Sequence, residues 1–402
     1  MSKSFYLFIS LALGINFWNL IILEPYFNGV TNPVLAVLWA MLGLYWFRPR
    51  FGYEKIYDFR KYQKYFYWLI VGFSFSVFSA YMFWYQDLKT GIIVNRFLIW
   101  YIYLPLVFYI QPSEKDIINS IFYYTVVYFF VWTVQALTPY PLYTTLADAI
   151  ELGRGKFEGS DTDFGQLIPG YSIILLLLYF KTQQLIEKPD YKAIIQVFAL
   201  LGLFFLLQNR GALFFAVIVF AYAMLKLKTW YKYVLIPIFA AFIAIAYFYS
   251  AEHWNALILE TIEQINDPNT PRWRSFNMFM FAYSPHWLCN ILGNGLLSAN
   301  VPAGKFIQNL MDQGIYQYDN GMIGFWSQYG IIPMLVLYTV IFKLLFQSKF
   351  PFYVKAMAAH ILFIPIAWNF GSADIIIFVI LIYLFAYYRE TSKLNQMAYA
   401  SP

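Results

Sequence analysis

The chain has little charge and very few cysteine and histidine residues, and these shortages exclude several classes of protein. Only 12% of its 402 residues are charged, against about 25% in typical soluble domains. The single cysteine, Cys289, excludes an internal disulfide and a multi-cysteine metal site. The three histidines have no ligand spacing, and the sequence contains neither an HExxH pattern nor a Walker phosphate-binding loop. We therefore expect neither a zinc protease nor an ATPase, and no metal or cofactor.

Hydrophobic residues, by contrast, make up 61% of the chain and aromatic residues 23%. Apolar runs recur from Phe5 to the region of Tyr387, each long enough to cross a hydrocarbon core about 30 Å thick as a helix. The sequence therefore predicts an all-α, polytopic integral membrane protein with about twelve transmembrane helices. The predicted spans are residues 5–23, 32–47, 65–85, 92–110, 116–138, 166–180, 193–207, 211–225, 233–250, 320–342, 353–368 and 372–388.

Lysine and arginine gather on one side of this predicted arrangement. The segment between the second and third spans holds Arg48, Arg50, Lys55, Arg60, Lys61 and Lys64. This is the positive-inside pattern, and it predicts that both termini lie in the cytoplasm. Because the basic residues are dispersed between apolar runs, the net charge of +6 does not indicate a nucleic-acid partner. We expect a single membrane domain, 1–402, with two long outer segments, 139–165 and 251–319, of the kind that often carries function.

Four arginines stand in predicted outer segments, where this pattern makes arginine rare. Arg210 lies between two apolar runs, Arg272 and Arg274 flank a tryptophan in the larger loop, and Arg154 lies in the smaller loop. Each has a plain alternative: a snorkelling side chain, an interfacial anchor or a solvated loop charge. Together they suggest a cradle for a lipid-linked diphosphate, because a guanidinium matches phosphate oxygens. Such a cradle would also stabilise a departing diphosphate.

Asp319 stands where the larger outer loop re-enters the predicted membrane. One interpretation is a helix N-cap, whose carboxylate accepts backbone N–H groups. The other is a general base that takes a proton from an attacking sugar hydroxyl. One residue can serve both roles, so the sequence leaves both open.

Four short segments give the chain a family resemblance. These are NRGAL around Arg210, TPRWRSFNMFMFAYSPHWLCNILGNG ending at Gly293 and Gly295, GRGKFEGSDTDFGQ around Arg154, and DNGMIGFWSQYGIIP from Asp319. In order and layout they resemble the O-antigen polymerase and ligase superfamily of bacterial polysaccharide assembly. Two departures stand out: Ser160 and Asp161 replace the usual end of the Arg154 motif, and Asp319 stands where ligases typically have histidine.

This resemblance implies a GT-C-like membrane fold with one large periplasmic loop, in a bacterial inner membrane. It implies a metal-independent, inverting glycosyltransferase that moves glycan from one undecaprenyl diphosphate carrier to the non-reducing end of another lipid-linked repeat unit. Arg154, Arg210, Arg272 and Arg274 would bind the diphosphate, with Arg210 and Asp319 as catalytic residues. Expected partners are an undecaprenyl-diphosphate-linked oligosaccharide, membrane lipid and a chain-length-regulating co-polymerase.

Two other functions remain open from the sequence. A ligase would use the same donor but deliver glycan to the lipid A core, and Asp319 in place of histidine tilts the resemblance away from it. A flippase or secondary transporter of lipid-linked sugar can also have twelve helices. Transporters tend to place charges near the membrane midplane and to show two-fold repeats, whereas the unusual charges here fall in outer segments.

Overall fold

The structure is a computed structural model of the chain. The structure describes residues 1–14, 31–47, 60–137, 170–206, 210–227, 230–249, 269–313, 321–364 and 374–400, and the single positions 255, 259, 262, 267, 315 and 317.

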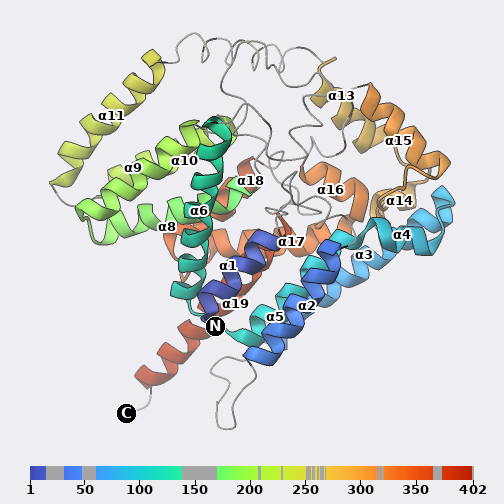
Figure 1. Cartoon of the computed structure of the whole chain (residues 1–402), viewed down its shortest axis with the longest axis horizontal. Helices are drawn as coiled ribbons and strands as arrows, with labels where there is room; N and C mark the ends of the chain where they lie inside the picture. The colour runs from blue at the N-terminus through green and yellow to red at the C-terminus, as the bar shows by residue number, and fades with distance from the viewer. Residues whose placement is uncertain are drawn as a thin grey trace.

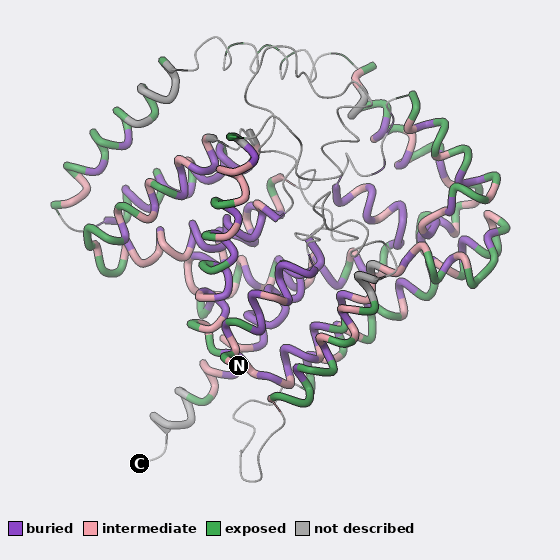
Figure 2. The backbone as a smooth tube through the Cα atoms, viewed as in Figure 1, coloured by how far each residue is buried: buried purple, intermediate pink, exposed green. Residues whose placement is uncertain are grey.

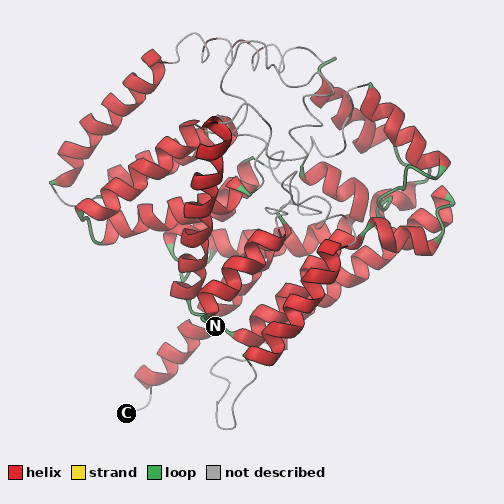
Figure 3. Ribbon diagram, in the orientation of Figure 1, coloured by secondary structure: helices red, strands yellow, loops and turns green. Residues whose placement is uncertain are grey.

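The described residues form helices joined by loops and contain no strand (Figure 3). The first part of the chain forms α1 (Lys3–Gly14), α2 (Thr31–Trp46), a short 3-10 turn η2 (Arg60–Tyr62), α3 (Gln63–Trp84), α4 (Leu88–Val94), the 3-10 helix η3 (Arg96–Ile102), α5 (Tyr103–Ile110) and α6 (Glu114–Leu137). The middle part forms α8 (Tyr171–Glu187), α9 (Tyr191–Leu206), α10 (Arg210–Lys226) and α11 (Tyr231–Tyr249). The last part forms α13 (Pro271–Asn277), the π-helical turn η5 (Met278–Ala282), α14 (Trp287–Leu292), α15 (Pro302–Asp312), α16 (Met322–Tyr329), α17 (Ile331–Phe346), α18 (Phe352–Phe363) and α19 (Ile375–Ala400).

Three described helices are long and apolar enough to cross a membrane, namely Arg60–Trp84, Glu114–Gln135 and Ile375–Leu394. A fourth span would result if α4 and the helical stretch after it, which meet at 72°, were counted as one broken span. The shorter apolar helices lie at Lys3–Gly14, Val34–Trp46, Tyr191–Phe205, Gly211–Lys226, Tyr231–Ala241, Ile331–Phe346 and Phe352–Phe363. An all-helical architecture with membrane-spanning character is thus present in the described part of the chain.

The C-terminal helix α19 is the centre of the molecule. In the apolar 18-residue stretch of α19, 67% of the residues are buried, against 33% in the corresponding stretch of η2 with α3 and 39% in that of α6. Residues 375–386 are buried all round the helix, as expected for an apolar helix enclosed by others. It packs against α1, α5, η3 and α17. Buried residues gather on these inner helices, while large apolar side chains are exposed along α2 and α11 (Figure 2).

Two of the predicted spans are interrupted, which corrects the expectation of one continuous helix in each. The predicted span 320–342 consists of α16 and α17, separated by Gly330 at φ 79°. The predicted span 92–110 contains the end of α4, then η3 and α5, with the break at Asn95. At this break the Asn95 side-chain amide donates to the carbonyl of Gly91 at 2.8 Å, a local bond that competes with continued helix.

The two termini lie at one end of the molecule, and α13 and α15 lie at the other (Figure 1). We call the second the distal end. Here a small hydrophobic cluster of Phe279, Tyr283, Leu310 and Ile315 packs beside the main core and contacts Trp84, the last residue of α3. The helices of the larger predicted loop are therefore anchored on a long apolar helix.

Candidate functional site

Two glycines form a backbone crossing at the distal end. Gly293 follows α14 with φ 87° and ψ 157°, and Gly330 separates α16 from α17 with φ 79° and ψ −172°. A Cβ atom on Gly293 would lie 2.6 Å from the Gly330 nitrogen, and one on Gly330 would lie 2.6 Å from the Gly293 nitrogen. Only glycine adopts this backbone region readily, and only glycine lets two backbones approach so closely. We call this contact the glycine crossing.

Asn294, between the two glycines of the Gly293–Gly295 motif, fixes the crossing through hydrogen bonds. Its backbone N–H donates to the Ser327 carbonyl at 2.9 Å, and the Gly295 N–H donates to the Gln328 carbonyl at 2.7 Å. The last-turn carbonyls of a helix have no partner within it, so these bonds satisfy the end of α16. The fully buried Asn294 amide also donates to the Ser327 carbonyl at 3.0 Å and accepts from the Trp84 indole N–H at 2.9 Å.

A second set of contacts holds the chain that leads into α16. Gln317 donates to the Ser327 hydroxyl at 3.1 Å and accepts from the Gln328 amide at 2.9 Å, and all three side chains are buried. The Gln317 carbonyl rests against Gly324, where a Cβ atom would collide with it. The backbone on one side of residues 318–320 is therefore fixed on α16, and on their other side α16 begins at Met322.

Aromatic rings at the end of α3 join the crossing to the larger predicted loop. Trp84 stacks on Tyr283 with ring centroids 5.1 Å apart, and Phe83 stacks on His286 at 5.0 Å. Cys289 of α14 is buried 3.6 Å from the Ser79 hydroxyl of α3. Burial raises the pKa of the Cys289 thiol above its ordinary value, so this residue has the character of an inert packing cysteine.

The predicted site residues are only partly visible in this arrangement. Arg154 and Asp319 lie outside the described residues. Arg210 is the first residue of α10 and Arg272 the second of α13, and for both only the backbone is described. Arg274 is exposed on α13. Because α10 and α13 lie apart (Figure 1), the joint cradle of four arginines remains a prediction.

An apolar groove beside the crossing contains an arginine that the sequence reasoning had set aside. The groove has a volume of about 870 Å³ and lies between α3, α4 and η3. Its lining includes the apolar residues Phe73, Phe78 and Ile92, and Asn95 and Arg96 add polar groups. Arg96 is the charged residue among the described residues that line it. The signal was present, since Arg96 is a charged residue near the outer end of the predicted span 92–110.

Asp374 is a second residue that the sequence reasoning missed. It directly precedes α19, is 6% exposed, and accepts a hydrogen bond from the Ser172 hydroxyl of α8 at 2.8 Å. A carboxylate before the first turn of a helix is stabilised by the helix dipole. Its position ahead of the most apolar run of the chain was the available signal, because a buried carboxylate there needs polar partners.

Within the described part of the chain, no three His, Cys, Asp or Glu side chains gather closely enough to hold a metal ion. Comparison of the chain with family models, with curated proteins and with solved structures found no match.

Proposed function

We propose that this chain is a membrane glycosyltransferase that polymerises lipid-linked saccharides, taking glycan from one undecaprenyl diphosphate carrier and adding it to another lipid-linked repeat unit. The observation that carries the proposal is the glycine crossing. It joins the Gly293–Gly295 motif to the segment that follows Asp319, and both segments belong to the family resemblance. Two motifs that serve one site are expected to meet in space.

Two further features support a lipid-linked, anionic substrate. Arg274 is exposed on α13, the helix that lies at the distal end (Figure 1). The groove between α3, α4 and η3 offers an apolar wall with Arg96 on its lining. An isoprenoid chain is apolar and can pack against that wall. A diphosphate is negatively charged, and its oxygens accept paired hydrogen bonds from guanidinium groups.

In the proposed reaction, a hydroxyl of the acceptor repeat unit attacks the anomeric carbon of the donor glycan. A new C–O bond forms as the bond from that carbon to the carrier diphosphate breaks, and the diphosphate leaves with the bonding electrons. Asp319 would accept the hydroxyl proton. Arg154, Arg210, Arg272 and Arg274 would stabilise the charge that develops on the leaving group. Attack from the face opposite the diphosphate inverts the anomeric centre.

We place this chemistry on the periplasmic side of a bacterial inner membrane that the chain crosses about twelve times. The support is the charge distribution at the end opposite the distal end. Lys61, Arg389 and Lys393 lie near the C-terminus, and basic residues favour the cytoplasmic side. The distal end then faces the periplasm.

The proposal is tested by turnover of a defined undecaprenyl-diphosphate repeat unit with purified protein in neutral detergent and EDTA. We expect Arg210→Ala and Arg274→Ala each to lower kcat roughly hundredfold, the usual loss when one charge-stabilising group is removed. Lys305→Ala is the matched control, because Lys305 is an exposed cation on α15 of the same loop, and it should keep full activity. Arg274→Lys should recover only part of the rate, since lysine lacks the planar fork.

Two results would assign the chain to the other functions. Transfer of glycan to lipid A core without chain growth would identify a ligase. Movement of the lipid carrier across liposomes without any new glycosidic bond would identify a transporter. Equal loss of activity in Lys305→Ala and Arg274→Ala would remove the specific role of Arg274.

A further inference from the structure

A hollow of about 590 Å³ lies between the turn after α17 and the C-terminal half of α19. Its lining, as given by the described residues, holds three cations and no carboxylate. Lys349 comes from the turn, and Arg389 and Lys393 stand one helical turn apart on α19. The rest of the lining is Phe346, Gln347, Ser348 and Ser392.

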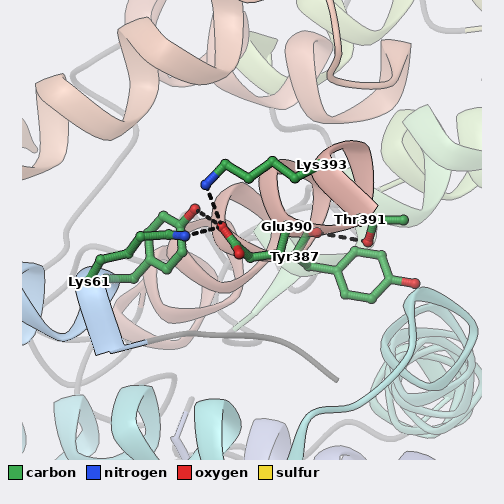
Figure 4. Close-up of polar contacts among 6 residues, drawn as sticks. Lys61, Tyr387, Glu390, Thr391 and Lys393 are labelled. Carbon is green, nitrogen blue, oxygen red and sulfur yellow. Dashed lines mark hydrogen bonds and ion pairs between the residues drawn. The ribbon is translucent and has the colours of Figure 1, made fainter. Parts of the chain in front are cut away.

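The neighbouring carboxylate, Glu390, pairs with Lys61 outside the hollow and with Lys393 of its lining (Figure 4). It forms an ion pair with Lys61 and accepts a hydrogen bond from the Tyr62 hydroxyl at 2.8 Å. Lys393 reaches the same carboxylate oxygen at 3.2 Å. One negative charge therefore serves Lys61 and Lys393 together, and it does not line the hollow that Lys349 and Arg389 face.

The three cations act on one another across the hollow. The pKa of Lys349 is lowered first by burial and then by the positive charges of Arg389 and Lys393, while the nearby Glu390 carboxylate acts in the opposite direction with a smaller effect. A bound anion would relieve this repulsion. A second polar hollow, of about 470 Å³ between α8 and α9, provides a contrast. It holds Lys181, Lys188 and Lys192 beside Glu187 and Asp190, so two carboxylates offset all but one of its positive charges.

An apolar strip leads into the cationic hollow. Phe346, the last residue of α17, is 74% exposed and stacks on Phe342 with ring centroids 6.0 Å apart. Phe342 in turn stacks on Tyr338 at 5.9 Å. These three rings lie along one face of α17, which is one of the shorter apolar helices of the chain. A ligand that fills the hollow thus meets cations at one end and an apolar strip at the other.

We infer that this hollow binds the phosphate of an anionic phospholipid, with an acyl chain along Phe342 and Phe346. The phosphodiester oxygens would accept hydrogen bonds from Lys349 and Arg389, a charge-assisted arrangement typical of phosphate sites. Free inorganic phosphate shares this chemistry, but it would leave the apolar strip unused. The inference is independent of the proposed function, because the site lies away from the distal end.

Native mass spectrometry of the full chain in neutral detergent tests this inference, with phosphatidylglycerol, phosphatidylcholine and inorganic phosphate as probes. We expect phosphatidylglycerol to be retained in preference to the other two. The double variant Lys349→Gln/Arg389→Gln should lower that retention roughly tenfold, since each cation near an anionic lipid changes affinity several-fold. The matched control is Lys188→Gln/Lys192→Gln, which removes the same charge from the second hollow, where carboxylates offset most of the lysine charge, and should leave retention within about twofold.

Three results would overturn the inference. These are equal retention of phosphatidylcholine, equal loss in the control variant, and saturation by inorganic phosphate at the same concentration. If the double variant does not fold, crosslinking of wild-type protein with photoreactive phosphatidylglycerol decides the question. Crosslinks at Phe346 or Lys349 would support the site, and crosslinks confined to other segments would refute it.

Discussion

Replacing Gly330 by alanine should destabilise the protein strongly. Gly330 has φ 79° and ψ −172°, a region that costs about 1–3 kcal/mol for a residue with a Cβ atom. That atom would also meet the Gly293 nitrogen at 2.6 Å and the Leu292 carbonyl carbon. Both belong to backbone that no rotamer change can move, so overpacking adds about 1–3 kcal/mol. The expected loss in unfolding free energy is about 2–6 kcal/mol.

Thermal unfolding in detergent, followed by loss of the monodisperse size-exclusion peak, measures this effect. A chain of 402 residues has an unfolding entropy of about 0.8 kcal/mol per degree on the scale of soluble proteins, so Tm should fall by about 2–7 °C. Gly202→Ala is the control, because Gly202 lies in α9 with nothing within 4 Å of its added Cβ atom, and helical alanine is favoured over glycine by about 0.5–1 kcal/mol. The reasoning would be refuted if Gly330→Ala and Gly202→Ala had the same Tm.

Three further predictions concern the same end of the molecule. A double-mutant cycle of Trp84→Phe and Asn294→Ala should give a coupling energy of about 1 kcal/mol in the stability derived from Tm, because each change removes one partner of the same buried hydrogen bond. Strictly additive losses of stability in the double variant would contradict that bond. Cys289 should react slowly with maleimide at pH 7.5, because burial raises the pKa of its thiol. A cysteine introduced by Trp287→Cys in a Cys289→Ala background should react fast, since position 287 is 64% exposed. Equal reaction rates would refute the burial of Cys289. Asp87 caps α4, and its hydrogen bonds to Thr90 hold the pKa of its carboxyl below the ordinary value, so its contribution is present at neutral pH and is lost as pH falls through that lowered pKa. Hydrogen exchange at the start of α4 should therefore quicken in acid for the wild type but change little in Asp87→Ala.

The helices could be located from the sequence, because an apolar run in a chain with 12% charge leaves few alternatives to a helix. The positions at which two of these helices break could not be located in the same way. Hydropathy continues across Gly330 and Asn95, so a window average treats each region as one span. At Gly330 the helix ends where the backbone passes close to Gly293, which is a contact between distant parts of the chain. At Asn95 it ends at a local bond, because the side-chain amide donates to the Gly91 carbonyl.

The candidate site was predictable as a set of motifs but not as an arrangement. The segments around Gly293 and Asp319 carried the resemblance, yet nothing in their spacing indicated that their backbones touch. The bond between Trp84 and Asn294 spans 210 positions, and a single sequence holds no signal for such pairing. Arg96 was passed over for a related reason, because its groove is lined mainly by α3, α4 and η3, and the break at Asn95 that separates the last two is not visible in the hydropathy.

The most direct test of the account is to incubate the purified wild-type chain with a defined undecaprenyl-diphosphate repeat unit in EDTA and to resolve the products by size. We predict a ladder of lipid-linked oligomers, each longer than the last by one repeat unit, with undecaprenyl diphosphate released in equal number to the bonds formed. Unchanged substrate, under conditions in which the protein stays folded and a cognate repeat unit is supplied, would contradict the proposed polymerase.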